Sequence, residues 1–278
     1  MAVKFSSAFL TYLSDQAGDH LISEISESVP FTKASESTLK SWGFVPVIDT
    51  FICEKYDHCQ IYSVMFEEKK IPNSNVMYLV EKEIKRRGNN DKPSKKEISD
   101  LKREIKNKLL RKALSTYSKA YLVYYPSKKS ILTLNCSVKK IQPLFDLIKR
   151  HGISPHSLDT DNVVNLLKGI VQDNNVPTEI TDLELDNQFN FFWPVDKSRA
   201  NFKNIDPDST LVSLAIEDGD VSKIKIYDDD LSCCINENLL LSSIKLSPPN
   251  TEMSDRDLLL FQVSKIFNVI EEFHKLAS

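Results

Sequence analysis

Glycine is scarce in this chain, with only six among 278 residues, and each of them stands alone. Neither G-x-x-x-x-G-K-[ST] nor G-x-G-x-x-G occurs, although these are the patterns whose glycines let a backbone approach bound phosphates. We therefore do not expect a phosphate-cradling NTPase. Long apolar runs are missing too, because no stretch of about 18 apolar residues exists, and the sequence predicts no membrane span.

Cysteine is also sparse and carries no pattern of a disulfide framework. Five cysteines, an odd number in a chain of this length, are typical of reduced thiols. The first residues lack an apolar run followed by a small-residue cleavage site, so we expect a cytoplasmic protein. Cys53, His58 and Cys59 lie close together, but their spacing fits no common zinc pattern. The sequence therefore predicts no metal and no other cofactor.

Charge, in contrast, is abundant and sharply segregated. Residues 81–140 carry 18 Lys and Arg against 6 Asp and Glu, or +12, while the other 218 residues carry 18 against 33, or −15. A field of one sign attracts polyanions, of which nucleic acid is the commonest. We expect phosphate contacts from Lys82, Lys85, Arg86, Arg87, Lys92, Lys95, Lys96, Lys102, Arg103, Lys106, Arg111 and Lys112.

Two helices are expected within this basic segment. Apolar residues recur at helical spacing over 76–87, and Ser94 with Glu97 three residues later forms a capping-box pattern that opens a second helix. Two short strands, 121–125 and 131–135, follow. The sequence predicts that the two charged helices form a hairpin projecting from the body.

Strands and helices elsewhere mix without a βαβ rhythm, which predicts an α+β fold with antiparallel sheets and packed helices. We expect a strand at 4–13, helices at 138–151, 163–171 and 255–275, and a further strand at 239–246. Residues 172–209 are predicted to be irregular, and 210–216 with 221–227 to form a β-hairpin around Asp218 and Gly219. We divide the chain into a body (1–72, 136–175 and 205–278) and a basic tip (73–135).

Each charged feature also has an explanation in which it serves structure or solubility rather than binding or catalysis. The basic helices can be solvated faces with ion pairs such as Glu81–Lys85 and Glu104–Lys108, although six acids cannot pair 18 bases. Acids at 217–220 and 228–230 could converge as nuclease metal ligands. Their Asp and Gly composition at strand ends is more typical of turns.

Beyond these patterns, an ordered set of segments resembles the bacterial recombination-associated RdgC family. The similarity is strongest over residues 3–150, moderate over 205–275 and faint over 172–204. No single motif is diagnostic. The matching segments are residues 5–13, 30–32, GFVP at 43–46, EEKKIP at 67–72, LLRKALSTYS at 109–118, LVSLAI at 211–216 and KIKIYDD at 223–229.

The resemblance implies a horseshoe-shaped protomer and a ring-shaped homodimer that encircles double-stranded DNA with little sequence preference. It implies a nucleoid-associated protein that inhibits RecA-type recombination and has no catalytic residues. The dimer contacts would map to Leu114 and Tyr117 at one end and to Lys197 at the other. Two alternatives stay open: an interaction protein that directly inhibits a repair recombinase or nuclease, and a metal-dependent nuclease.

Overall fold

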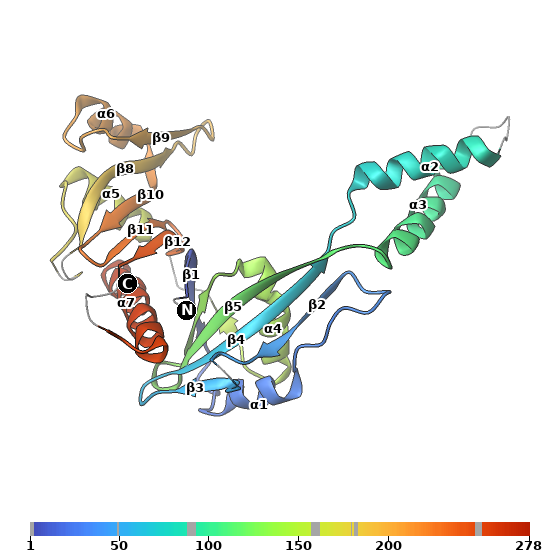
Figure 1. The fold of residues 1–278 in the computed structure, drawn as a ribbon. Coiled ribbons are helices and arrows are strands. Elements are labelled where there is room, and N and C mark those ends of the chain that lie inside the picture. The colour runs from blue at the N-terminus through green and yellow to red at the C-terminus, as the bar shows by residue number, and fades with distance from the viewer. Residues whose placement is uncertain are drawn as a thin grey trace.

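The computed structural model describes residues 3–48, 50–87, 93–156, 162–178, 180, 183–247 and 252–278. Within them the strands form one sheet, and every pairing between named strands is antiparallel (Figure 1). The predicted α+β class with antiparallel pairing is therefore confirmed. The strand order is β2 (Lys40–Val45), β4 (Gln60–Lys69), β5 (Ser115–Tyr125), β6 (Ser130–Leu134), β1 (Ser7–Leu13), β12 (Leu241–Leu246), β11 (Leu231–Asn236), β10 (Asp220–Tyr227), β8 (Glu184–Phe192) and β9 (Arg199–Lys203).

Two short strands complete the sheet: β3 (Cys53–Lys55) pairs with β4, and β7 (Pro155–His156) pairs with β1. The link between the two halves of the sheet is the brief pairing of β1 with β12, where Ser7 lies opposite Ser242 and Ala8 opposite Leu241. The two halves are therefore joined mainly by β1 and by the helices packed across it.

The middle of the sheet is covered on both faces, as the alternation along β5 makes clear. Tyr121, Val123 and Tyr125 belong to one core, whereas Leu122 and Tyr124 belong to the other. Successive side chains of a strand point to opposite faces, so a strand buried on both sides reads as a continuous apolar run. Helices α5 (Val163–Gln172) and α7 (Asp255–Ala277) pack in the first core, and α1 (Leu21–Ser28) and α4 (Val138–Arg150) in the second.

The remaining helices lie at the two ends of the molecule. Helices α2 (Asn73–Arg87) and α3 (Lys95–Leu110) extend away from the sheet beyond the ends of β4 and β5, and α6 (Thr210–Asp218) lies with β9 at the opposite end (Figure 1). A 3-10 turn (Pro126–Lys128) joins β5 to β6. None of the described helices is long and apolar enough to cross a membrane.

Most of the predicted elements are confirmed with small shifts of their ends. These are β1, both helices of the basic segment, α4, α5, β12 and α7. The strand predicted at 121–125 is β5, which begins six residues earlier, at Ser115. Both β5 and its neighbour β6 lie inside the sheet, between β4 and β1.

Two predictions about the second half of the chain were wrong. Residues 172–209 are not irregular, because β8 and β9 form a hairpin in which Phe189 lies opposite Phe202. Residues 210–216 are not a strand but part of α6, which buries Val212 and Ala215 at a spacing of three. The strand predicted at 221–227 exists as β10, but its partners are β8 and β11.

Candidate nucleic-acid interface

The hairpin of α2 and α3 is held together by a narrow apolar seam. Val76 and Val80 of α2 are almost fully buried against Leu101 and Ile105 of α3, which are 6% and 8% exposed. A seam this narrow uses one stripe of each helix and leaves the other faces to solvent. The charged side chains of both helices therefore lie outside the packed seam.

Helix α3 begins at the predicted capping box. The Ser94 hydroxyl accepts a hydrogen bond from Glu97 N at 3.2 Å, and Glu97 Oε2 accepts one from Ser94 N at 2.8 Å. The backbone hydrogen bond from Ser94 holds the pKa of Glu97 below its ordinary value. This carboxylate is thereby committed to the helix end, where negative charge is favourable.

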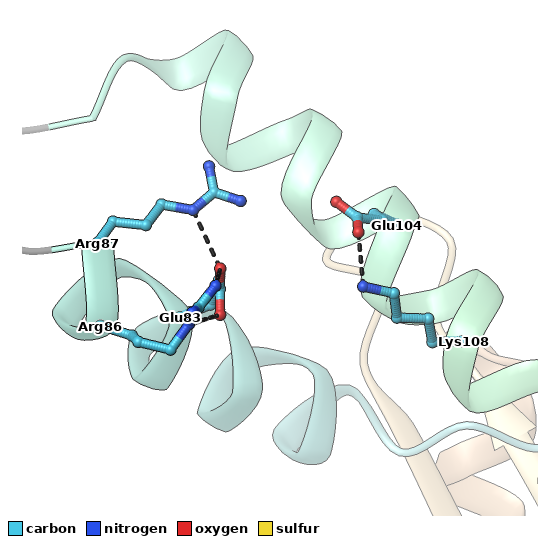
Figure 2. A network of polar contacts seen from close by, with 5 residues as sticks. All are labelled: Glu83, Arg86, Arg87, Glu104 and Lys108. Atoms are coloured by element: carbon cyan, nitrogen blue, oxygen red, sulfur yellow. Dashed lines mark hydrogen bonds and ion pairs between the residues drawn. The ribbon is translucent and has the colours of Figure 1, made fainter.

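Glu83 of α2 is shared between two arginines (Figure 2). Its two oxygens accept from Arg86 Nε and Nη2 at 2.9 and 2.8 Å, and Oε1 also accepts from Arg87 Nε at 3.2 Å. The hydrogen bonds from Arg86 and Arg87 lower the pKa of Glu83 to about 2. One carboxylate thus offsets part of the charge of both guanidinium groups.

Two further pairs lie on α3. Asp100 pairs with Arg103 at 3.1 Å, and the predicted pair of Glu104 with Lys108 forms at 2.6 Å (Figure 2). The hydrogen bond from Lys108 keeps the pKa of Glu104 below its ordinary value. The other predicted pair, Glu81 with Lys85, does not form within the described residues.

After these pairings the hairpin and the turn that follows α3 retain a set of cations without a carboxylate partner among the described residues. All are exposed except Lys102, which is half-buried. The structure brings them onto the solvent faces of two packed helices and the turn that follows α3, but their contact with nucleic acid remains a prediction. They are Lys82, Lys85, Lys95, Lys96, Lys102, Lys106, Arg111 and Lys112.

The other predicted contact residues divide into two groups. Arg86, Arg87 and Arg103 are the cations whose charge is partly offset by a neighbouring carboxylate. Lys92 lies outside the described residues. The candidate interface therefore contains cations that are paired with a carboxylate and cations that are not. A binding experiment can distinguish the contributions of the two groups.

The residues predicted as dimer contacts lie in two separate places, at the root of the hairpin and at the β8–β9 turn. Leu114 is 86% exposed and Tyr117 is 51% exposed, where the chain leaves α3 and enters β5. Lys197 lies in the turn between β8 and β9, with a positive φ of 60°, and its N–H donates to Trp193 O at 2.9 Å. The structure keeps these sites apart within one protomer, and contact with a second copy remains a prediction.

Two features at the root of the hairpin were missed by the sequence reasoning. Glu67 is a buried carboxylate, only 3% exposed, that binds three hydrogen-bond donors. Lys69 and Lys70 line a cleft together with α3. The signal was the run of charged residues at 67–70, whose directions at the end of β4 the sequence alone does not reveal.

Asp228 of the second acid cluster and the thiol of Cys59 are engaged or buried within the fold. Asp228 Oδ1 accepts from Asp230 N and Leu231 N at 2.7 and 2.6 Å, and Oδ2 pairs with Lys265 at 2.7 Å. Burial raises the pKa of the Cys59 thiol to about 12. Among the described residues, no three or more His, Cys, Asp or Glu side chains are grouped so that they could hold a metal ion.

Comparison with known proteins adds one finding to this geometry. A family model described as "Putative exonuclease, RdgC" matches residues 13–257, which is most of the chain and includes the whole hairpin. No curated protein matches the chain.

Proposed function

The chain belongs to the RdgC family, and from that premise we propose that it is a non-enzymatic protein that binds double-stranded DNA without reading its sequence. The binding surface is the hairpin of α2 and α3. Two horseshoe-shaped copies close into a ring around the duplex, and the bound duplex is withheld from a RecA-type recombinase. The protein acts at the nucleoid in the cytoplasm.

One observation carries this proposal: four of the five acids described in the hairpin are engaged within it, whereas eight cations of the hairpin and of the turn after α3 have no carboxylate partner among the described residues. Lysines that extend from helix faces can reach phosphates but have no fixed geometry for reading base edges. Each phosphate contact releases condensed counterions. Binding should therefore depend weakly on sequence and steeply on salt.

The positions of the exposed residues predicted as dimer contacts support the ring. Leu114 and Tyr117 lie near the root of the hairpin, and Lys197 lies at the β8–β9 turn, at the far end of the sheet. If both sites join the same sites of a second copy, each contact is isologous and the assembly closes. A closed ring holds duplex topologically, so modest phosphate contacts suffice for long residence.

Duplex affinity measured as a function of salt tests the binding surface. Each contacted phosphate contributes a slope of about −0.9 to log K against log salt, so the eight unpaired cations allow at most about −7 per protomer. The variant Lys95→Glu, Lys96→Glu, Lys102→Glu, Arg103→Glu should lose duplex binding while its melting temperature stays close to that of the wild type. Undiminished affinity in this variant would overturn the assignment.

The control variant reverses the charge of one lysine at the opposite end of the molecule. Lys203 of β9 is exposed, and Lys203→Glu should leave duplex affinity within about twofold, apart from long-range screening effects. Topological closure has its own readout. In high salt, the dissociation rate of the protein should be higher from a short linear duplex than from a closed circle. Equal dissociation rates would argue against a ring.

A second candidate function comes from the family description, which names an exonuclease. Such activity would require carboxylates that hold Mg²⁺ at the scissile phosphate. Asp218 at the end of α6 and Asp220 at the start of β10 are the acids to test, because Asp228 is engaged by its own turn and by Lys265. Mg²⁺-dependent shortening of DNA by the wild type, lost in Asp218→Asn, Asp220→Asn, would establish a nuclease.

The third possibility, direct inhibition of a repair enzyme, is separated by the charge-reversed variant. If that variant no longer binds DNA yet still inhibits a purified recombinase or nuclease on short substrates, inhibition acts through protein contact. If inhibition disappears together with DNA binding, it acts through the duplex. The two outcomes exclude each other.

A further inference from the structure

A cleft of about 870 Å³ lies at the root of the hairpin, between α3 and the segment that joins β4 to α2. This volume is in the range of pockets that bind small molecules. One wall is a face of α3 in which Ser99, Lys102 and Lys106 follow one another at spacings of three and four. The opposite wall is formed by residues 69–72.

The charge of this cleft is positive because Glu68, the one carboxylate among its described lining residues, is already engaged. Glu68 pairs with Lys40 at 3.1 Å, and among the lining cations Arg103 pairs with Asp100. Lys69 Nζ donates to Ser35 O at 2.7 Å. Three lining cations have neither a carboxylate partner nor a side-chain hydrogen bond among the described residues, namely Lys70, Lys102 and Lys106.

Apart from Asn107, the rest of the lining is aliphatic and consists of Leu39, Ile71, Pro72 and Leu110, with Leu39 51% exposed. Burial of such surface is favourable only if the ligand brings an apolar group with its charge. A duplex presents phosphates outward and keeps its bases stacked inside, so it could reach the lysines but not the aliphatic lining. An unstacked nucleotide offers both a phosphate and the face of a base.

We propose that this cleft binds an unpaired nucleotide of single-stranded DNA, with its phosphate against Lys70, Lys102 and Lys106 and its base over Leu39 and Ile71. The proposal rests on the proposed DNA-binding function, because α3 carries cations along its remaining length. A strand that leaves the cleft therefore stays on a cationic surface. An acidic peptide with apolar side chains is the competing ligand, and the experiment separates the two.

The experiment compares three fluorescent probes at about 50 mM salt: a thymidine hexamer, a hexamer of abasic sites with the same phosphates, and a blunt 20-base-pair duplex. The wild type should bind the thymidine hexamer about tenfold more tightly than the abasic hexamer, since one base buries apolar surface against Leu39 and Ile71. In Leu39→Ser, Lys70→Ala the two hexamers should bind equally and weakly. Duplex affinity should change by less than about threefold.

The matched control removes one exposed leucine and one exposed lysine elsewhere, as Leu276→Ser, Lys203→Ala, and should preserve the preference for bases. Equal affinity of the wild type for the two hexamers would overturn the proposal. So would an acidic peptide whose binding is lost in Leu39→Ser, Lys70→Ala while hexamer affinity is unchanged. Failure of the wild type to bind duplex, with the hexamer preference intact, would instead contradict the proposed duplex function and leave the cleft assignment standing.

Discussion

Glu67 Oε1 accepts a hydrogen bond from Ser115 Oγ at 2.5 Å and thereby joins the end of β4 to the start of β5. The same carboxylate accepts from Ala34 N at 2.6 Å and from Tyr117 OH at 3.3 Å. Because β4 leads into α2 and β5 follows α3, this buried group holds both roots of the hairpin. It therefore ties together the two strand ends from which the basic helices leave the sheet.

The first prediction concerns the pH dependence of that junction. The hydrogen bond from Ser115, followed by that from Ala34 N, holds the pKa of Glu67 below the ordinary value of 4.5. A depressed folded-state pKa stabilises the fold above about pH 4.5, and this contribution is lost as the pH falls through the folded-state value. In Glu67→Gln one acceptor becomes an NH2 group facing a donor, so the melting temperature should drop at pH 7.

Thermal unfolding between pH 7 and pH 3 checks this. The difference between wild type and Glu67→Gln should be largest near neutrality and shrink below about pH 4.5. The exposed Glu81 of α2 supplies a control, since Glu81→Gln should change the melting temperature little at any pH. A difference that stays constant across this range would contradict the assigned role of the carboxylate.

The second prediction concerns the shared carboxylate Glu83. Since it offsets the charge of Arg86 and Arg87, Glu83→Gln should free both guanidinium groups for phosphates. We expect duplex affinity at low salt to rise by about three- to tenfold and the salt slope to steepen by one to about two phosphate contacts. A fluorescence anisotropy titration at several salt concentrations measures both.

The paired and unpaired cations of α2 provide the comparison for this result. Lys82→Ala should weaken duplex binding more than Arg86→Ala, because Lys82 has no carboxylate partner among the described residues and Arg86 has one. In the Glu83→Gln background the two alanine variants should weaken binding equally. If Glu83→Gln lowers affinity instead, this face of α2 does not contact the duplex.

The basic helices were predictable because several local signals agree there. Ser94 and Glu97 mark the start of α3, and the apolar stripe through Leu101 and Ile105 continues it, so capping and periodicity indicate the same element. The strands β5 and β6 were predictable for the same reason, as dense runs of β-branched and aromatic residues. Local agreement of this kind does not depend on distant parts of the chain.

In the second half of the chain, the prediction of secondary structure failed where local signals conflict. Residues 211–216 are mostly apolar, which suggests a strand, yet Leu211 and Leu214 are exposed and Val212 and Ala215 are buried, which is the pattern of a helix packed on one side. In β8, Phe189 and Phe191 alternate with polar residues as a half-buried strand requires. The period of two was present there but was hidden by the polar composition.

The ion pairs of the candidate site could be predicted only in part. Glu81–Lys85 and Glu104–Lys108 have the same spacing, yet only the second pair forms among the described residues, and Glu83 binds two arginines instead. Which of these ion pairs forms depends on the directions of the side chains on neighbouring helical turns. The spacing of residues in the sequence does not reveal those directions. The cleft at the root of α3 depends on the packing of α3 beside residues 69–72, which only the tertiary structure shows.

The third prediction concerns the exposed leucine beside the root of the hairpin. Leu114 is 86% exposed, so Leu114→Asp should not destabilise the protomer, but it would place a charge in a contact that buries this side chain. We expect the dimer dissociation constant to rise by at least about tenfold, which corresponds to about 1.4 kcal/mol. Sedimentation at several concentrations measures it.

A control for that variant lies on another exposed side chain. Phe51 is 62% exposed, and Phe51→Asp should leave the dimer constant unchanged. If Leu114→Asp also sediments with the same mass distribution as the wild type, the proposed dimer contact at Leu114 is wrong. Tyr117 is less suitable for this test because its hydroxyl also binds Glu67.

The fourth prediction contrasts two glycines whose surroundings differ. A Cβ at Gly43 of β2 would lie 2.5 Å from Phe31 Cα and 2.8 Å from Pro30 C, which are backbone atoms that cannot turn aside. Gly43→Ala should therefore destabilise the fold by about 1–3 kcal/mol, as overpacking does. At Gly169 of α5 a Cβ meets nothing within 4 Å. Because alanine favours a helix, Gly169→Ala should stabilise by about 0.5–1 kcal/mol.

Urea unfolding of the two variants measures these opposite signs in one experiment. The backbone of Val29, Pro30 and Phe31, which we call the strap, runs beside β2. There Phe31 N donates to Phe44 O and Phe44 N donates to Val29 O. An alanine at position 43 must push this strap away or break these hydrogen bonds. If Gly43→Ala unfolds at the wild-type urea concentration, the strap does not lie against β2 in solution, and the packing at this edge of the sheet differs from that described.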